Sequence, residues 1–447
     1  MLHPSLGALC NSCVTGSGYS GLYGLDALSE VRFPRRAFKK GGRSEMKRGR
    51  ASAAIITLAG IIACGVAATG SPAYAKAKSP VSIGVITTLT GPLGPYGVEW
   101  MRGFRIGLEY ATKGTDRVDG RTISVIVKDD GGDPNMAVQE AKSLLQDDHV
   151  NIVAGLVNSA SAIAVEPFAL KFRTVMMIGP AVADEITGKY YNPYIFKVSP
   201  NSFMESKAAV DAIGKPGTTV AQLAPNYSFG WDSVAAFQKL AAAAHIKDIA
   251  NVFADPAATD FTPQLEKIIN MHPHYLYVTW AGAPGPWKTI EEMKLQEQGI
   301  QVVTGIPNIA AIEALFQGDA GMRGYTTYYY TLPHNAVNNY LIRQDKAQYN
   351  TVPDLFDPNG MAAAIALVDG LRKTGGNAAG SALSTALSGM AFDGPTGPFY
   401  FRPQDHQALQ NLYTVVLRDE KGVGYPVPVL TKVLSAKQTV PPILNKR

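Results

Sequence analysis

From residue 81 onward, hydrophobic residues recur with two alternating periods. The run VSIGVIT, residues 81–87, alternates Val and Ile with smaller or polar residues and predicts a strand. After the glycine- and proline-rich stretch 91–97, the apolar positions have helical spacing, which predicts one face of an amphipathic helix. That face consists of Trp100, Phe104, Leu108 and Ala111. A strand that leads through such a loop into a helix is the first half of a βαβ unit, and these units bind ligands where the strand ends.

The same alternation continues along the rest of the chain. Asp133 and Pro134 predict a helix start after the second strand, as N-cap and first helical residue. The further predicted strands are 123–128, 151–157, 175–178, 219–224, 249–253, 275–280, 301–304, 325–330, 399–402 and 412–418. The further predicted helices are 159–172, 203–213, 231–244, 263–270, 287–297, 336–348 and 358–374. The pattern predicts an α/β protein built from doubly wound parallel sheets with helices on both faces.

The formal net charge of +5 comes from the N-terminal region. Residues 1–75 hold nine Lys and Arg against three Asp and Glu, a contribution of 9 − 3 = +6, which leaves the remainder at 5 − 6 = −1. Such a nearly neutral body lacks the basic surface that nucleic-acid binding requires. The chain has 447 residues, 46% of them hydrophobic, which is enough for two or more domains. We therefore expect a protein of at least two domains that does not bind nucleic acid.

The N-terminal region also predicts export. Met46 begins a short positive segment, residues 51–68 are apolar, and the stretch that ends at Ala75 has the A-x-A pattern of a cleavage site. We interpret 46–75 as a secretory signal peptide, with a transmembrane helix as the alternative. Residues 1–45 are then a non-native extension before the true start. Cleavage would release the protein into the periplasm.

The cysteines support the same interpretation and add one alternative. All of them precede the predicted cleavage site: Cys10, Cys13 and Cys64. The exported chain would therefore have no disulfide, no thiolate metal site and no Cys nucleophile. The segment from Ile61 to Cys64 also resembles a lipobox, in which Cys64 would become a lipid-modified N-terminus.

Rival functional sites have weak support in the sequence. The glycines of 91–97 have G-x-x-G-x-x-G spacing, and Asp129 lies 129 − 97 = 32 residues past the last of them, against about 20 for a dinucleotide fingerprint. His272 and His274 have no Cys or nearby Glu to complete a metal site. No G-x-S-x-G motif occurs. We expect no cofactor, no metal and no enzymatic activity.

Six segments of the chain resemble one known family. They are TGPLGPYG, RGFRIGLEYA, VDGRTISVIVKDDGGDPNMAVQEAKSLL, GLVNSASAIAVEP, YIFKVSPN and FDGPTGPFYF. In this order they resemble the periplasmic solute-binding proteins of the leucine-isoleucine-valine-binding type, over essentially 76–442. The resemblance implies two α/β lobes with a ligand cleft between them, joined by three crossover segments near Pro200, Tyr330 and Phe399. Such a protein closes around a small solute and delivers it to the membrane permease of an ABC importer.

The resemblance also implies how the chain divides between the lobes. Residues 76–200 and 331–398 would form the first lobe, and 201–330 and 399–447 the second. We expect the protein to act as a monomer.

One part of the ligand site can be predicted from the residues themselves. The helix that begins near Ser159 has N–H groups without intrahelical partners and a partial positive charge, so it can bind a carboxylate. The candidate residues are Asn158, Ser159, Ala160 and Ser161. The alternative is that Ser159 only caps its helix, although capping and binding are compatible.

Further site residues are implied by the resemblance alone. Ala181 matches a position whose backbone contacts the ligand, and Tyr227 and Tyr96 match aromatic residues of the cleft. Ala183 stands where amino-acid binders commonly have Thr or Ser, and its methyl group cannot hydrogen-bond a ligand. Each Tyr could instead be ordinary packing.

Two departures from the family pattern bear on the ligand. Pro307 lies in the segment where amino-acid binders carry an acid for the ligand ammonium, and Trp280 replaces a small or polar patch. A buried ammonium without its carboxylate would cost several kcal/mol. We therefore predict an apolar cleft with one anion-binding end and a carboxylate ligand without an α-amino group, an aromatic or aliphatic acid. The alternatives are a branched-chain amino acid and, as a third class, an extracellular sensor with the same fold.

Overall fold

The computed structural model describes residues 78–445. The predicted extension 1–45, the predicted signal peptide 46–75 and Cys64 lie outside these residues. Over 78–445, no helix is both long and apolar enough to cross a bilayer.

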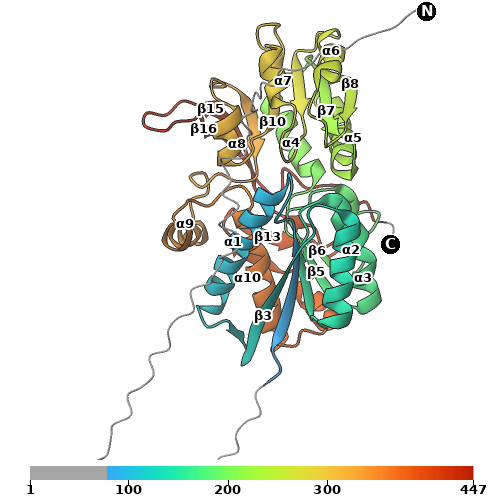
Figure 1. Cartoon of the computed structure of the whole chain (residues 1–447), viewed down its shortest axis with the longest axis vertical. Helices are drawn as coiled ribbons and strands as arrows, with labels where there is room; N and C mark the ends of the chain where they lie inside the picture. The colour runs from blue at the N-terminus through green and yellow to red at the C-terminus, as the bar shows by residue number, and fades with distance from the viewer. Residues whose placement is uncertain (1–77, 446–447) are drawn as a thin grey trace, which may run out of the picture. The chain divides into compact units, whose positions relative to one another are not determined.

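A six-stranded sheet forms the centre of the first lobe (Figure 1). Its strand order is β2-β3-β1-β4-β5-β6, and all neighbours are parallel except β2, which runs antiparallel to β3. The strands are β1 (Val81–Thr87), β2 (Arg117–Val118), β3 (Arg121–Asp129), β4 (Ile152–Gly155), β5 (Val175–Ile178) and β6 (Ile195–Lys197). The chain order reverses beside β1, which lies between β3 and β4, so the loops after β1 and β4 flank a topological switch point.

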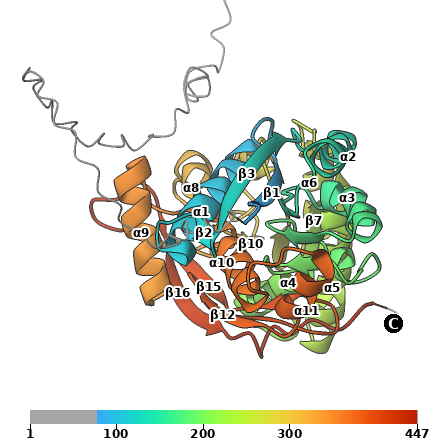
Figure 2. The same cartoon turned by 90° about the horizontal axis from the view of Figure 1, so that it is seen from below.

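Helices cover both faces of this sheet, as predicted. One face carries α1 (Gly94–Thr112), α9 (Ala336–Tyr349), α10 (Asp357–Lys373) and α11 (Gly380–Leu387), and the other carries α2 (Pro134–Lys142), η2 (Ser143–Asp147), α3 (Ser159–Phe172) and η3 (Asp184–Ile186). Figure 2 shows α1 and α9 on one side of β1 and β3, and α2 and α3 on the other. The predicted apolar face of α1 is buried. Helix α10 crosses α1 so closely that a Cβ on Gly103 would lie 1.9 Å from the carbonyl oxygen of Asp357.

The second lobe contains a seven-stranded sheet with the order β16-β15-β11-β10-β9-β7-β8. The strands are β7 (Thr219–Pro225), β8 (Lys247–Ala254), β9 (Tyr275–Val278), β10 (Gln301–Gly305), β11 (Arg323–Thr326), β15 (Leu412–Arg418) and β16 (Val427–Leu434). Helices α4 (Ser202–Ile213) and α5 (Ser228–Ala243) pack on one face, and α6 (Thr262–Ile269), α7 (Trp287–Glu292) and α8 (Ile309–Leu315) on the other.

The predicted fold class is confirmed: both sheets are mostly parallel, with antiparallel strands added at an edge. Strand β15 runs antiparallel to β11, and β16 runs antiparallel to β15. The reason is local, because β15 and β16 form a hairpin that joins the edge of an otherwise parallel sheet. Sequence periodicity identifies such a strand but contains no information on its direction. Strands β2, β6 and β16, the strands at 391–394 and 408–409, and helices α8 and α11 were not predicted, and α7 ends at Glu292 instead of near residue 297.

A third, small antiparallel sheet belongs to the first lobe. It consists of β12 (Ala391–Gly394), β13 (Gly397–Phe401) and β14 (Ala408–Leu409). Phe399, Phe401 and Ala408 are buried in the same core cluster as α1 and α10. The ring centroids of Phe196 and Phe401 are 5.3 Å apart. The expected boundary between 398 and 399 therefore falls inside β13, and the chain leaves the first lobe at residues 410–411.

Residues 198–201, 327–335 and 410–411 connect the lobes, and the C-terminal segment after β16 crosses between them a fourth time within the described residues. Two of these connections are joined by buried glutamines: Gln407 Nε2 donates to the Ser199 carbonyl at 2.8 Å, and Gln410 Nε2 donates to the Val198 carbonyl at 2.6 Å. The C-terminal segment after β16 returns to the first lobe, because Arg402 Nη1 donates to the Pro441 carbonyl at 2.7 Å. This return differs from the expected assignment of 399–447 to the second lobe.

Candidate ligand-binding site

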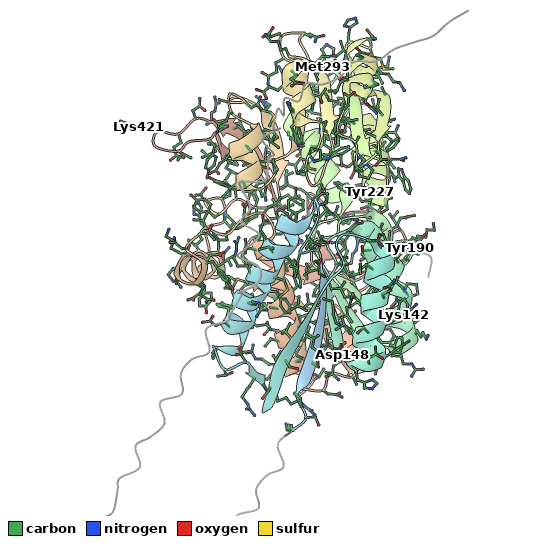
Figure 3. The ribbon with its side chains drawn as sticks, in the orientation of Figure 1. Lys142, Asp148, Tyr190, Tyr227, Met293 and Lys421 are labelled. Carbon is green, nitrogen blue, oxygen red and sulfur yellow. The ribbon has the colours of Figure 1, made fainter. Side chains whose placement is uncertain are left out.

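A cavity of about 100 Å³ lies between the loops at the carboxyl ends of both sheets. The first lobe contributes residues that follow β1, β4 and β5: Leu93, Tyr96, Val157, Ser159, Pro180, Ala181 and Val182. The second lobe contributes residues at or after β7, β9, β10 and β11: Tyr227, Phe229, Val278 to Ala281, Gly305 to Pro307, and Tyr325 to Thr327. Glu205 of α4 and the Leu355–Phe356 pair before α10 complete the lining. Figure 3 places Tyr227 where the two lobes meet, whereas Met293 and Lys421 lie far from this level. The position agrees with the rule that α/β sheets bind ligands beyond the carboxyl ends of their strands.

The amino end of α3 is the polar end of this pocket. The N-cap is Asn158, whose Oδ1 accepts from the Ala160 N–H at 2.8 Å and whose Nδ2 donates to the Gly132 carbonyl at 3.0 Å. Ser159 is therefore the first helical residue and not the cap, which removes the capping alternative. The N–H groups of Ser159 and Ser161 make no backbone hydrogen bond, so α3 retains the free donors expected at a helix start.

Ser159 connects α3 to the loop after β5. The side chain is 3% exposed, and its Oγ accepts from the N–H groups of Val182 and Ala183, each at 3.2 Å. Because both lone pairs face these amides, the hydroxyl proton is directed away from them and is available to a ligand anion. A carboxylate at this end of the pocket would receive that proton and the free amides of α3.

A buried lysine, which we did not single out from the sequence, lies behind this loop. Lys197 of β6 is 0% exposed, and its Nζ donates to the carbonyls of Val182 at 3.0 Å and Ala183 at 2.9 Å. Burial lowers the pKa of Lys197 to about 8, and nearby acids, Asp184 first among them, oppose that shift. A cation immediately behind the loop favours an anion in front of it. The sequence signal was a lysine inside the apolar strand residues 195–198.

A carboxyl group in the pocket was also missed. Glu205 of α4 is half-buried and lines the cavity. Burial raises its pKa to about 7, the charge of Lys197 opposes the shift and Asp184 adds to it. The prediction of an apolar cleft with a single polar end is therefore wrong. The error arose because the search for an acid was confined to the segment around Pro307, whereas α4 approaches the pocket from the first connection between the lobes.

Aromatic side chains form the remaining walls. Tyr96 packs edge-on against Phe356 with ring centroids 4.7 Å apart, and its hydroxyl oxygen accepts from the Gly282 N–H at 3.3 Å. Burial raises the pKa of Tyr96 to about 12, so the phenol is neutral at all physiological pH values. Trp280 packs edge-on against Phe261 with centroids 5.0 Å apart. These rings give the cavity between the two lobes mainly apolar walls.

The structure brings together only part of the predicted site. Tyr96, Ser159, Ala181, Tyr227, Trp280 and Pro307 line the cavity. Asn158, Ala160, Ser161 and Ala183 are not among its lining residues. Ala183 is fully buried, and its backbone binds Ser159 and Lys197 instead of facing the cavity. Ala181 donates its N–H to the Leu156 carbonyl at 3.2 Å, and its carbonyl accepts from Ser199 Oγ, so both of its backbone groups already have partners within the protein.

The other motifs weighed in the sequence have structural explanations. Asp129 accepts from the Leu89 N–H at 2.8 Å and from Thr90 Oγ1 at 2.8 Å, which closes the loop after β1 and occupies the acid that a ribose would need. Asp133 caps α2 as predicted. His274 Nδ1 contacts Thr219 Oγ1 at 2.7 Å. Within the described part of the chain, no cluster of three or more His, Cys, Asp or Glu residues could hold a metal ion.

Hydrogen bonds across the pocket hold the two lobes together. Asn308, the N-cap of α8, donates from Nδ2 to Glu99 Oε1 of α1 at 2.8 Å. Asp354 Oδ2 accepts from the Ile309 N–H at 2.9 Å, and Asp232 Oδ2 of α5 accepts from the Glu185 N–H at 3.1 Å. Burial raises the pKa of Glu99 and brings that of Asp354 to about 7. These contacts, together with that between Tyr96 and Gly282, require the closed arrangement of the lobes.

Two α/β lobes that enclose a pocket at their strand ends define a bilobal solute-binding protein. The sequence comparison agrees: a family model described as periplasmic binding protein matches residues 80–422, and the chain belongs to this family. It is of the leucine-isoleucine-valine-binding type, whose members are non-enzymatic, extracytoplasmic solute-binding components of ABC transporters.

Three relatives illustrate the range of the family. A structure named as an ABC-type branched-chain amino acid transporter from Rhodopseudomonas palustris CGA009 is 35% identical, with a TM-score of 0.72, over 82% of this chain and 100% of the other. A solute-binding protein from R. palustris in complex with benzoate is 25% identical, with a TM-score of 0.70, over 78% and 96%. A Leu/Ile/Val-binding protein homologue from Brucella abortus is 24% identical over 81% of this chain and 93% of its own.

Proposed function

We propose that this protein captures a small carboxylate, an aromatic or aliphatic acid, and delivers it to the membrane permease of an ABC importer. The observation that carries the proposal is the unequal pocket. One end has the Ser159 hydroxyl, the free amides of α3 and the buried Lys197, while the walls are mainly aromatic or apolar, with Glu205 as the charged exception. An anion with a flat apolar body matches both parts.

Lobe closure supplies the mechanism. The solute carboxylate first binds the first lobe at Ser159, because the donors there are fixed within that lobe by Val182 and Ala183. Rotation about residues 198–201, 327–335 and 410–411 then brings Tyr227 and Trp280 over the solute body. A solute that contacts both lobes stabilises the closed form, which is the form that the permease recognises.

Closure also forms contacts away from the solute. Asn308 meets Glu99, and the Ile309 N–H meets Asp354. These bonds stabilise the closed form whatever solute is present, so they contribute to affinity and not to selectivity.

The location and state of the protein follow from the same proposal. A signal peptide at 46–75 would deliver the chain to the periplasm, where it acts as a monomer. Attachment through Cys64 is the alternative. Identification of the N-terminal peptide of the exported protein decides between them.

A branched-chain amino acid is the second candidate, and two observations favour it. Relatives at 35% and 24% identity carry branched-chain amino-acid names. Glu205 also places a carboxyl in the pocket that can pair with an ammonium group. The benzoate complex of the relative at 25% identity supports the first candidate.

A ligand screen tests the proposal. Protein freed of bound solute by unfolding and refolding is heated with benzoate, propionate, leucine or valine, and mass spectrometry identifies the solute that the untreated protein carries. We expect benzoate to raise the melting temperature more than leucine or valine do, because a ligand of the native state stabilises it by mass action. Stabilisation by leucine or valine and by neither plain acid would replace the proposal with the amino-acid alternative.

A further inference from the structure

The pocket contains one carboxyl group that the protein itself leaves without a partner. Glu205 follows the N-cap Asn201 by one helical turn, so the first connection between the lobes and the start of α4 position it. Among the residues that the structure describes, none donates a hydrogen bond to its carboxylate. A half-buried carboxyl in this situation loses free energy unless a bound molecule supplies the missing partner.

The polar groups around Glu205 already have other hydrogen-bond partners. They come from four elements: Lys197 of β6, Asp184 at the start of η3, Tyr277 of β9 and Tyr325 of β11. Lys197 directs its Nζ to the carbonyls of Val182 and Ala183.

The two tyrosines and Asp184 are occupied in the same way. The hydroxyl oxygens of Tyr277 and Tyr325 lie 3.3 Å apart and form a hydrogen bond. Asp184 Oδ1 accepts from the Phe203 N–H at 3.1 Å. None of these groups donates a hydrogen bond to Glu205 in the structure, so a bound solute can supply the partner.

We propose that Glu205 binds a hydroxyl group of the solute, so that the pocket selects hydroxylated carboxylic acids over unsubstituted acids of the same shape. The inference rests on the proposed function, because it assumes that the carboxylate of the solute occupies the end of the pocket at Ser159. Glu205 is then the specificity-determining residue of the second lobe.

A hydroxyl group fits this position better than an ammonium group does. The charge of Lys197 already acts on Glu205, so a second cation beside it would be repelled by the first. A hydroxyl group meets no such repulsion. It also pairs with a carboxyl in both protonation states, donating to the ionised form and accepting from or donating to the protonated one, whereas an ammonium group needs the ionised form. The pKa of Glu205, raised to about 7 by burial, makes both states relevant near neutral pH.

Calorimetric titration with matched acids tests the proposal. Refolded, solute-free protein is titrated with benzoate, 3-hydroxybenzoate and 4-hydroxybenzoate. A hydrogen bond to a charged group predicts that the wild type binds one hydroxybenzoate about tenfold to hundredfold more tightly than benzoate. Glu205→Met should remove this preference without lowering the affinity for benzoate. Glu205→Gln should retain most of the preference, because an amide still hydrogen-bonds a hydroxyl group.

Glu266→Met is the matched control, because Glu266 is exposed on α6 and does not line the pocket. Equal affinities of the wild type for all three acids, or an unchanged preference in Glu205→Met, would overturn the proposal. Binding of leucine that Glu205→Gln abolishes would identify an ammonium partner and would also overturn it. Failure of every carboxylate to bind would refute the proposed function itself, whereas benzoate binding without a hydroxyl preference would refute only the role of Glu205.

Discussion

The two lobes contribute unlike halves to one pocket. In the first lobe, the polar groups are held by backbone: Ser159 accepts from two amides, and Lys197 donates to two carbonyls of the same loop. In the second lobe, the lining consists mainly of rings and apolar side chains, with Tyr227, Trp280 and Pro307 among them. Under the proposed function this difference would divide the roles: the first lobe would bind any carboxylate, and the second would select the rest of the solute.

Glu205 is the exception that limits this division. It belongs to the second lobe by its helix, yet its strongest opposite charge, Lys197, belongs to the first. The boundary between general and selective binding therefore lies at the first connection between the lobes. Four changes test the comparison, from the largest expected effect to the smallest.

Replacement of Lys197 by Met should have the largest effect of the four changes, lowering both the stability of the first lobe and its affinity for a carboxylate. The change leaves two buried carbonyls and the acids near them without their cation, so the free energy of unfolding should fall by about 3 kcal/mol or more. Benzoate affinity should fall by about tenfold or more, because the cation behind the loop would no longer attract the carboxylate. Denaturant unfolding and calorimetry measure the two effects. Lys207→Met, which breaks the i,i+4 ion pair of Lys207 with Asp211 on α4, is the control and should cost about 1 kcal/mol or less. Equal losses in both variants would contradict the role of Lys197.

Replacement of Ser159 by Ala should weaken all carboxylates alike. The lost hydrogen bond to a charged ligand predicts an increase in Kd of about tenfold to hundredfold for benzoate and propionate. Ser161→Ala is the matched control on the same helix, since Ser161 is buried but does not line the pocket. A loss of affinity for only one of the two acids would contradict this division of roles, because the first lobe would then contribute to selectivity.

Replacement of Trp280 by Ala should discriminate between the same two acids. The indole offers apolar area to an aromatic ring and little to a short chain, so benzoate should lose about tenfold in affinity and propionate much less. Trp231→Ala is the control, because Trp231 is 51% exposed on α5 and lies outside the lining. Similar losses for both acids would show that the second half also binds the carboxylate.

The pH dependence of benzoate affinity tests whether the charge of Glu205 affects the binding of the solute carboxylate. In the free pocket its pKa is raised to about 7, and an anion bound nearby raises it further, so binding takes up a proton. Affinity should therefore fall as pH rises from about 6 to 8, by at most about tenfold per pH unit. Deprotonation of Lys197, whose pKa is about 8, acts in the same direction at higher pH. Titrations across this range should show a flatter profile for Glu205→Gln, and a wild-type affinity that increases with pH would contradict the expected coupling.

Much of the fold could be predicted from the sequence, because strands and helices impose their periods on short runs of residues. The apolar face of α1, the cap of α2 and the alternation through both lobes follow from local geometry. The amino end of α3 was predicted for the same reason, since free N–H groups exist wherever a helix begins. The sequence suggested Ser159 as a possible N-cap of α3, whereas in the structure the N-cap is Asn158, one residue earlier.

What only the tertiary structure decided depends on contacts between distant segments. Strands β12 to β14 belong to the first lobe because Phe399 and Phe401 fill its core. The spacing of apolar residues along these strands does not predict that long-range contact. Lys197 and Glu205 became site residues because β6 and α4 flank the first connection and bring two charges of opposite sign to one pocket. By itself, the sequence determined most of the elements, the family and the helix end at which we propose that the carboxylate binds. The polarity of the opposite wall was decided by packing, because burial and long-range approach determine whether a charged side chain faces solvent, a protein partner or a ligand.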